Sequence, residues 1–345
     1  AIDRFSPPHD QGSSHGESRI IRRAYFEHPD YVPLTFESYR QWAELEAELG
    51  RQLLVETGLV QAGPVDGHVL RGLLAAAERH QLPIELLTAA EAAARWPTLK
   101  VPPEAAAVFE QSAGYLLVEH CVAALLEAAK RSGAELLGDT HVVDWQAGNV
   151  LQVQTTNGVF LADRLILATG AWSSQWLAAL DVELQVLRKV LLWYGCDDPR
   201  VRVEAGMPAY LFELPQGVFY GFPRIGARGL KVAEHSGGDP TEQPSRLDRR
   251  LRETDRKPID EFLNQCVAAE IGELLEHSVC MYTMTRDQHF IIDRWPGDPR
   301  VTLAAGLSGH GFKFAPALGQ AVVDLAIDGA TDLPIKFLAL DRFEG

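Results

Sequence analysis

The sequence predicts a mixed architecture, α/β plus α+β, built as two domains. Two short apolar runs, at 164–168 and 301–305, each lead through a glycine towards a helical segment, which is typical of strands covered on both faces in a parallel sheet. A block at 182–232 instead holds several short strands separated by Gly and Pro turns, as in an antiparallel sheet. Segments of helical period separate the strands, and no tandem repeat is present.

Apolar spacing and local capping residues place the individual elements. Thr88 is a good N-cap three residues before Glu91, so a helix is predicted to begin at 89. Asn157-Gly158 lies between two alternating runs and predicts a hairpin. Helices are predicted at 36–49, 67–80, 89–95, 120–131, 246–268 and 316–327. Further strands are predicted at 135–145, 150–155, 158–161, 189–195, 209–213, 217–222 and 230–232, with a surface loop at 236–245.

Length, charge and cysteine content limit the class of protein. The 345 residues suggest two domains, and 47 acidic against 32 basic side chains give a net charge of −15, without a basic run that could meet a phosphate backbone. A nucleic-acid partner is therefore disfavoured. The longest uncharged apolar stretch is far short of the roughly 20 residues that cross a bilayer, so no membrane partner is expected. Four scattered cysteines without a Cys-x-x-Cys pair, and an N-terminus unlike a secretion signal, predict a cytoplasmic location and no metal site.

Two glycine-containing loops follow the apolar strands. Gly306, Gly309 and Gly311 precede a predicted helix, where free backbone amides suit an anion or the pyrimidine end of a flavin. An ordinary strand-to-helix turn explains these glycines equally well. In the same loop, His310 has the pattern of a structural histidine, and Lys313 has that of a solvated lysine at the start of a helix. The Ala-Thr-Gly at 168–170 ends the other apolar strand in the same way, at the edge where open α/β sheets bind ligands.

Three further positions have both a functional and a structural interpretation. Arg19 and Arg22 are three residues apart, which on a helix places both guanidinium groups on one face, as an anion clamp or as surface ion pairs. Lys231 is flanked by apolar residues and is either desolvated and functional or directed outwards from an edge strand. Cys280, in a β-like run, has the pattern of a small buried hydrophobe.

Six segments, in this order, carry a family resemblance. They are Ser-His-Gly-Glu-Ser-Arg-Ile-Ile-Arg at 14–22, Ala-Thr-Gly-Ala-Trp-Ser at 168–173, Phe-Tyr-Gly-Phe-Pro at 219–223, Gly-Leu-Lys-Val-Ala-Glu-His at 229–235, Val-Cys-Met-Tyr-Thr at 279–283 and Gly-Leu-Ser-Gly-His-Gly-Phe-Lys-Phe at 306–314. Over essentially its whole length the chain resembles the monomeric sarcosine oxidase and N-methyltryptophan oxidase family.

The resemblance implies a D-amino-acid-oxidase-like fold in which two domains interleave along the chain. A Rossmann-like FAD-binding domain is expected from 1–55, 116–182 and 286–345, and an antiparallel-sheet substrate domain from 56–115 and 183–285. The family opens with a strand, a Gly-x-Gly-x-x-Gly turn and a helix, and about 30 residues of this dinucleotide fingerprint are missing before Ala1. The sequence is therefore expected to be a fragment of a flavoenzyme or a truncated chain that cannot hold FAD well.

The resemblance also implies roles for particular residues. Cys280 matches the cysteine that links covalently to the 8α-methyl group of FAD, and Lys231 matches the lysine that activates oxygen. Arg22 and Lys313 match the pair that binds the substrate carboxylate, while Tyr220, His235 and Tyr282 match residues lining the substrate cavity. Asp3 matches the acid that binds a ribose hydroxyl, and further contacts to FAD are expected from Ser14, His15, Arg19, Val143, Gly170, Gly309, His310, Gly311 and Lys313.

The implied reaction is the oxidation of sarcosine by dioxygen to glycine, formaldehyde and hydrogen peroxide, catalysed by a monomer. Bulk at Leu211 and Phe212 favours a small substrate. N-methyltryptophan, pipecolate or another secondary amine acid is the alternative substrate. A cofactor-free remnant that acts as a binding protein is the alternative outside the enzymes.

Overall fold

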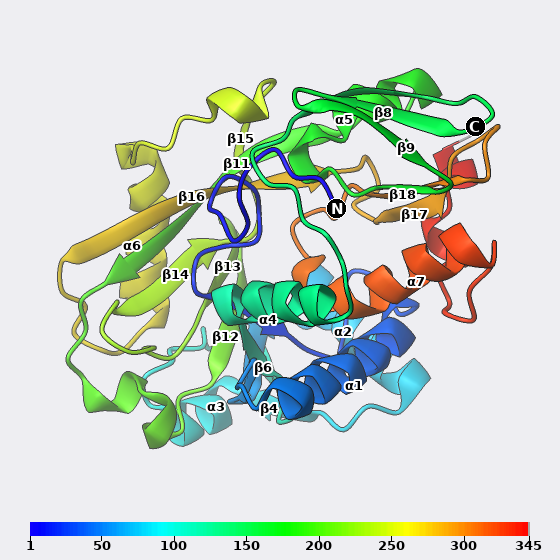
Figure 1. Ribbon diagram of the computed structural model, residues 1–345. Helices are drawn as coiled ribbons and strands as arrows, with labels where there is room; N and C mark the ends of the chain where they lie inside the picture. The colour runs from blue at the N-terminus through cyan, green and yellow to red at the C-terminus, as the bar shows by residue number, and fades with distance from the viewer. Residues whose placement is uncertain (344–345) are drawn as a thin grey trace.

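A nine-stranded sheet forms the largest layer of the computed structural model, which describes residues 1–343 (Figure 1). The strand order is β15-β11-β14-β13-β12-β3-β5-β4, and β16 also pairs with β11. All neighbours are antiparallel except β12 and β3. The strands are β3 (Leu59–Gly63), β4 (Glu85–Thr88), β5 (Ala106–Glu110), β11 (Gln185–Tyr194), β12 (Ala209–Leu214), β13 (Gly217–Gly221), β14 (Leu230–Glu234), β15 (Asp239–Pro240) and β16 (Leu274–Met284).

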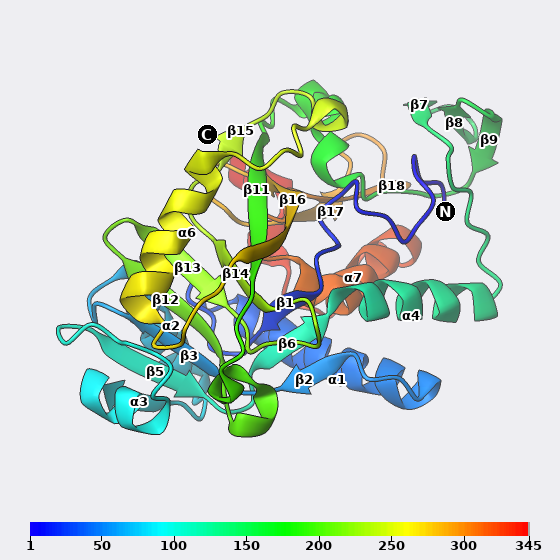
Figure 2. The same ribbon diagram turned by 90° about the vertical axis from the view of Figure 1, so that its left-hand side faces the viewer.

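The two faces of this sheet are covered by different cores, because side chains alternate along each strand. Phe212, Phe219 and Val232 contribute to one core, which α6 (Glu253–Cys266) covers (Figure 2). Residues on the opposite face contribute to a larger core, which packs against α2 and the segments around α7. This second face also carries Lys231, which alternates with Leu230 and Val232 of the first core, and Cys280, which belongs to the second core.

Three smaller sheets complete the fold. β10 (Leu165–Leu167) pairs in parallel with β18 (Val301–Ala305), which confirms the parallel pair predicted from the apolar runs, whereas β17 (Ile291–Arg294) joins β18 antiparallel. β7 (Val142–Gln146), β8 (Leu151–Thr155) and β9 (Gly158–Ala162) form a meander with the predicted hairpin at Asn157-Gly158. β1 (Ser18–Ile21), β6 (Gly114–Leu117) and β2 (Leu54–Glu56) form a sheet that the sequence did not predict.

The helices follow the predicted segments with shifted ends. Thr88 and Glu91 form the predicted reciprocal cap of α3. The helix predicted at 246–268 is shorter, because 244–252 forms a turn and a loop tied to Arg188. α1, α4 and α7 lie side by side, away from α6 (Figures 1 and 2). The longer helices are α1 (Tyr31–Leu49), α2 (His68–His80), α3 (Ala89–Arg95), α4 (Val118–Arg131), α6 and α7 (Ala315–Ile327), with a single turn at α5 (Ser174–Leu177).

The helical interpretation of the Arg19 and Arg22 spacing is wrong. Ser18–Ile21 is strand β1, whose four residues all pair with β6. In a strand, residues three apart point to opposite faces, but Arg22 lies just past the end of β1, where the chain turns. Sequence spacing therefore does not determine how these two guanidinium groups are arranged.

No helix within residues 1–343 is long and apolar enough to span a membrane. The strands of the nine-stranded sheet come from 59–110 and 185–284, inside the segments predicted for the substrate domain. We retain the division into an FAD-binding and a substrate domain as a proposal.

The stacking of α6 on the sheet generates a stability prediction. Phe262 is fully buried and lies parallel to Phe219, with ring centroids 5.0 Å apart. We expect Phe262→Ala to lower the free energy of unfolding by about 3–5 kcal/mol, because it leaves a cavity between helix and sheet. Phe36, which is 48% exposed, is the matched control. Phe36→Ala should change the free energy of unfolding by less than about 1 kcal/mol. Urea unfolding of both variants measures the difference, and equal losses would contradict this account.

Candidate active site

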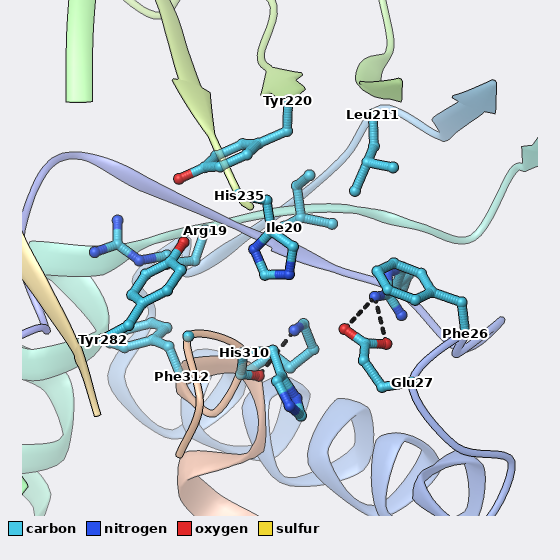
Figure 3. Close-up of a pocket in the computed structure, with 13 residues that line it drawn as sticks. Arg19, Ile20, Phe26, Glu27, Leu211, Tyr220, His235, Tyr282, His310 and Phe312 are labelled. Carbon is cyan, nitrogen blue, oxygen red and sulfur yellow. Dashed lines mark hydrogen bonds and ion pairs between the residues drawn. The ribbon is translucent and has the colours of Figure 1, made fainter. Parts of the chain in front are cut away.

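A cavity lies between β1, the sheet face that carries Lys231 and Cys280, and the loop before α7 (Figure 3). Tyr220 and Leu211 come from β13 and β12, Tyr282 from β16, and His235 from the residue after β14. The remaining residues come from the N-terminal strand, the turn after it, and the loop before α7. The lining residues are Arg19, Ile20, Arg22, Phe26, Glu27, Leu211, Tyr220, His235, Tyr282, Gly309, His310, Phe312 and Lys313.

Arg22 is held by a buried ion pair with Glu27 (Figure 3). Nη2 of Arg22 donates to both carboxylate oxygens of Glu27 at 2.8 Å, and the guanidinium lies 4.2 and 4.4 Å from the ring centres of Tyr25 and Phe26. Burial raises the pKa of Glu27, but Arg22, His310 and Lys313 outweigh burial and hold the pKa at about 2. The ion pair expected at the surface is therefore inside the cavity.

The backbone after Arg22 is fixed by a carboxylate from the large sheet. Glu110, at the end of β5 and buried, accepts hydrogen bonds from the backbone N–H of Arg23 at 2.7 Å and of Ala24 at 2.9 Å. These bonds hold the turn that directs Arg22 into the cavity. Burial raises the pKa of Glu110, and the two amides and the nearby arginines oppose that rise.

Lys313 and His310 form the opposite wall, and both are buried. Lys313 Nζ donates to His310 O at 2.9 Å and to Tyr25 Oη at 3.4 Å, so the solvated-lysine interpretation is wrong. Burial, and then Arg22, lower the pKa of Lys313 to about 7. His310 is placed by Tyr25 Oη at 2.7 Å from Nδ1 and by Gln288 O at 3.0 Å from Nε2.

Three residues from the sheet complete the cavity. The ring of His235 lies 5.8 Å from that of Tyr282 and 6.4 Å from that of Phe26. Burial lowers the pKa of His235 to about 4 and raises the pKa of Tyr220, so both side chains are neutral at pH 7. The structure thus places Arg22, Lys313, Tyr220, His235 and Tyr282 around one cavity, and their roles toward a substrate remain a prediction. Leu211 also lines the cavity, whereas Phe212 faces the other core.

Lys231 is buried in the interior of the sheet, because β14 lies between β11 and β13. The interpretation as an outward-pointing edge residue is therefore wrong. Its Nζ donates to Gly16 O at 2.5 Å and Ser18 O at 2.7 Å and lies 4.8 Å from the ring centre of Phe222. Burial, and then Arg19, lower its pKa well below the usual range. Lys231 is not among the residues lining the cavity.

The loop before β1 lies against the strand that carries Cys280. Ser13 Oγ donates to Met281 O at 2.6 Å, and His15 is hydrogen-bonded to Gly12 O at 3.1 Å and Ser278 Oγ at 3.3 Å. Burial, with Arg19 and Arg249, lowers the pKa of His15 to about 4. Cys280 is a buried free thiol next to this loop, and Ser14 is exposed.

The other predicted cofactor contacts lie in two places. Asp3 accepts from the Phe5 amide at 2.9 Å, and its backbone pairs with Leu137 and Thr140, three residues before the exposed Val143. Gly170, with φ +54°, begins the turn that leads to Trp172, whose ring packs 5.8 Å from Phe5. Gly309 lines the cavity and Gly311 is buried beside it.

A family model described as FAD dependent oxidoreductase matches residues 2–325, and the chain therefore belongs to this family of FAD-dependent oxidoreductases. The chain is 38% identical to the monomeric sarcosine oxidase of Arthrobacter sp. (strain TE1826), over 99% of this chain and 89% of that protein. It is 35% identical to the N-methyl-L-tryptophan oxidase of Yersinia pestis (strain Pestoides F), over 99% of this chain and 92% of that protein. The family is that of the sarcosine oxidase and N-methyltryptophan oxidase type, as the resemblance implied.

Solved structures show the same fold. Glycine oxidase from Geobacillus kaustophilus superposes with a TM-score of 0.80 at 21% identity, covering 99% of this chain and 91% of that one. The open form of the Tyr258Phe mutant of NikD, an unusual amino acid oxidase, gives 0.84 at 22% identity, covering 98% and 89%. At these identities the likeness establishes the fold.

The residues around Cys280 and the cavity fit a flavin. Arg19, Lys231 and Lys313 form no salt bridge within residues 1–343, and their protons go to backbone oxygens and to hydroxyl oxygens. Hydrogen-bond donors that can carry a positive charge and have no carboxylate partner suit a ring system that gains negative charge when it is reduced. The donor set thus matches the cofactor that the family uses.

Two cavity-related residues could not be found by sequence reasoning. Glu27 lies five residues after Arg22, a spacing that carries no signal in a turn, and Glu110 is 87 residues away from Arg23. The one available clue for Glu110 was an acid at the end of an apolar run, Ala-Ala-Val-Phe-Glu.

The buried ion pair generates a pH prediction. An unfolded Glu27 takes up a proton near pH 4.5, whereas the folded one remains ionised down to about pH 2, so the stabilisation is complete above pH 4.5 and is lost as pH falls towards 2. We expect Glu27→Gln to lower the free energy of unfolding by about 3 kcal/mol at pH 6. At pH 3.5, the difference in unfolding free energy between this variant and the wild type should be smaller by about 1 kcal/mol.

Urea titrations at the two pH values measure this gap. Glu104→Gln, at an exposed position, is the matched control and should show no gap at either pH. A gap for Glu27→Gln that stays constant with pH would refute the assignment.

Proposed function

We propose that this protein is an FAD-dependent oxidase of a small N-methyl amino acid, and that sarcosine is its substrate. Sarcosine, dioxygen and water would give glycine, formaldehyde and hydrogen peroxide. The observation that carries the proposal is the charge of the cavity: Arg22 and Lys313 are buried there with a single carboxylate, Glu27. The deficit of negative charge suits a ligand with a carboxylate. The 38% identity to sarcosine oxidases supports this substrate class.

Substrate binding follows from these contacts. The substrate carboxylate would replace Glu27 as a partner of Arg22 and would lie against Lys313. Because the pKa of Lys313 is about 7, a bound carboxylate would favour its protonated form. His235 is neutral and its ring nitrogens make no hydrogen bond within residues 1–343, so it can accept a hydrogen bond from the amine. Tyr220 and Tyr282 would confine the N-methyl group.

FAD, when bound, supplies the hydride acceptor and passes electrons to dioxygen. We propose that Asp3, Val143 and Gly170 hold its adenosine end. Around the flavin end we propose Ser14, His15, Arg19, His310 and the glycines Gly309 and Gly311. Lys231 would stabilise the negative charge that develops on oxygen. Cys280 would attach the cofactor as a thioether, in which Sγ bonds to the 8α carbon in place of the thiol proton and one methyl hydrogen; the two electrons released would reduce the flavin, and dioxygen would reoxidise it. We also propose a monomer.

The direct test is turnover of defined amines by purified protein. Sarcosine should yield hydrogen peroxide and formaldehyde in equal amounts, with a higher kcat/KM than N-methyltryptophan or pipecolate. The 35% identity to N-methyl-L-tryptophan oxidase makes N-methyltryptophan the second candidate. Preference for either larger amine would reject the proposed substrate. Absence of flavin absorbance together with absence of oxygen consumption would instead support a cofactor-free binding protein.

Covalent attachment has its own test. After denaturation, flavin should remain with the wild-type polypeptide and add the mass of FAD less two hydrogens, whereas Cys280→Ser should release it. Cys121→Ser is the matched control, since Cys121 is also a buried free thiol, on α4. Release of all flavin from the wild-type protein would refute the link, and so would retention by Cys280→Ser.

A further inference from the structure

Lys189, on β11, is a buried ammonium that the proposed mechanism does not use. It is 4% exposed and forms no salt bridge within residues 1–343. Its Nζ donates to three successive backbone carbonyls, those of His235 at 3.3 Å, Ser236 at 2.5 Å and Gly237 at 3.1 Å. It also lies 5.2 Å from the ring centre of Tyr282. One side chain therefore contacts two residues of the cavity wall.

The three carbonyls belong to a bulge in the sheet. β14 and β15 both pair with β11, with Ala233 opposite Leu191 and Asp239 opposite Arg188. Between these two pairs, the segment from β14 to β15 has five residues where β11 has two, so three residues are extra. Residues 235–238 therefore leave the ladder and pass over Lys189, and their carbonyls have no strand partner. His235 and Ser236 are partly buried and Gly237 is exposed, and Lys189 donates to the carbonyl of each. A carbonyl that is shielded from water is costly when it has no donor.

The shape of the bulge depends on two glycines. Gly237 has φ +63° and Gly238 has φ +113°, conformations that other residues rarely adopt. A Cβ on Gly238 would lie 2.9 Å from Cδ of Lys189 and 3.0 Å from Arg188 O. The chain is thus wrapped closely around the lysine stem.

His235 is the first residue of this bulge. Its backbone N–H donates to Val218 O at 2.7 Å, and its imidazole has no hydrogen-bond partner within residues 1–343. The direction of the ring is therefore set by the backbone at 235–237 and by the flanking rings of Phe26 and Tyr282. Lys189 holds that backbone from one side and Val218 from the other.

We propose that Lys189 is a positioning residue, which aims His235 at the substrate amine by holding the three carbonyls of the bulge. The proposal rests on the proposed function, because it assigns His235 a contact with the amine. Burial of Lys189 supports the same view: it lowers the pKa of the ammonium to about 8, while Glu234, Cys280 and Asp239 act to raise it. A charge is kept in the interior without a carboxylate only where backbone oxygens replace its water.

The test is a double-mutant cycle between Lys189 and His235. Lys189→Met keeps the stem and removes the donors, and it should lower kcat/KM for sarcosine roughly 10- to 100-fold, the effect of a misplaced group near the reacting atoms. In the His235→Ala background the same substitution should change kcat/KM by less than about 2-fold, because no imidazole is left to aim. Equal factors in both backgrounds would overturn the proposal. Lys336→Met, at an exposed position, is the matched control.

A second measurement does not depend on turnover. Hydrogen exchange of the peptide covering 233–240 should be roughly 10-fold faster in Lys189→Met than in wild type, with no change in α4 or α7. Unchanged exchange would overturn the proposal even if the protein oxidises sarcosine. If wild type oxidises no amine, the proposed function fails, and this exchange result still decides whether Lys189 holds the bulge.

A second variant covers the case in which Lys189→Met does not fold. Gly238→Ala keeps the ammonium but presses the bulge away from Lys189. It should give the same loss of kcat/KM and the same absence of effect in the His235→Ala background. A wild-type kcat/KM for Gly238→Ala would count against the proposal.

Discussion

The structure depends on how buried cations are compensated. Lys189, Lys231 and Lys313 are all buried on or beside the inner face of the large sheet, and none forms a salt bridge within residues 1–343. An isolated buried charge is expensive unless hydrogen bonds replace its hydration. Here the replacement comes almost entirely from backbone carbonyls. Each lysine therefore fixes a segment: Lys231 fixes the approach to β1, Lys189 the bulge after β14, and Lys313 the loop before α7.

This compensation explains why the cavity suits an anionic ligand. Carbonyl oxygens add no negative charge to the interior. Burial lowers the pKa of Lys313 to about 7, so an anion bound beside it favours its protonated form. Of the two cations in the cavity wall that face each other, Arg22 has a carboxylate partner, Glu27, and Lys313 has none within residues 1–343. Under the proposed function, a substrate carboxylate would bind between Arg22 and Lys313, and a flavin that becomes negative on reduction would have these positive groups nearby. The hydrogen bonds from these lysines to backbone carbonyls therefore fix the loops around the cavity and also leave the lysines without a carboxylate partner.

Local patterns predicted much of the fold. The Thr88 and Glu91 cap and the hairpin at Asn157-Gly158 depend on neighbouring residues and were predictable. The strands β10 and β18 were predictable for a different reason: each is a continuous apolar run, typical of a strand covered on both faces in a parallel sheet, although they pair across a long stretch of chain. The segment from Arg19 to Arg22 was not, because its strand exists only through pairing with β6, almost a hundred residues later. The short strands β2 to β5 escaped prediction for the same reason.

The sequence by itself determined the family and the residue types at the site, because six motifs retain their order and their chemistry. Through the family resemblance, it also predicted that Arg22, His235 and Lys313 belong to the substrate site. Only the tertiary structure decided the surroundings of each residue: Lys231 lies in a central strand, Glu27 forms an ion pair with Arg22, and Lys189 donates to the backbone carbonyl of His235. The physical reason is that burial and hydrogen-bond partners come from residues far apart in the chain, and burial and partners set both pKa and direction.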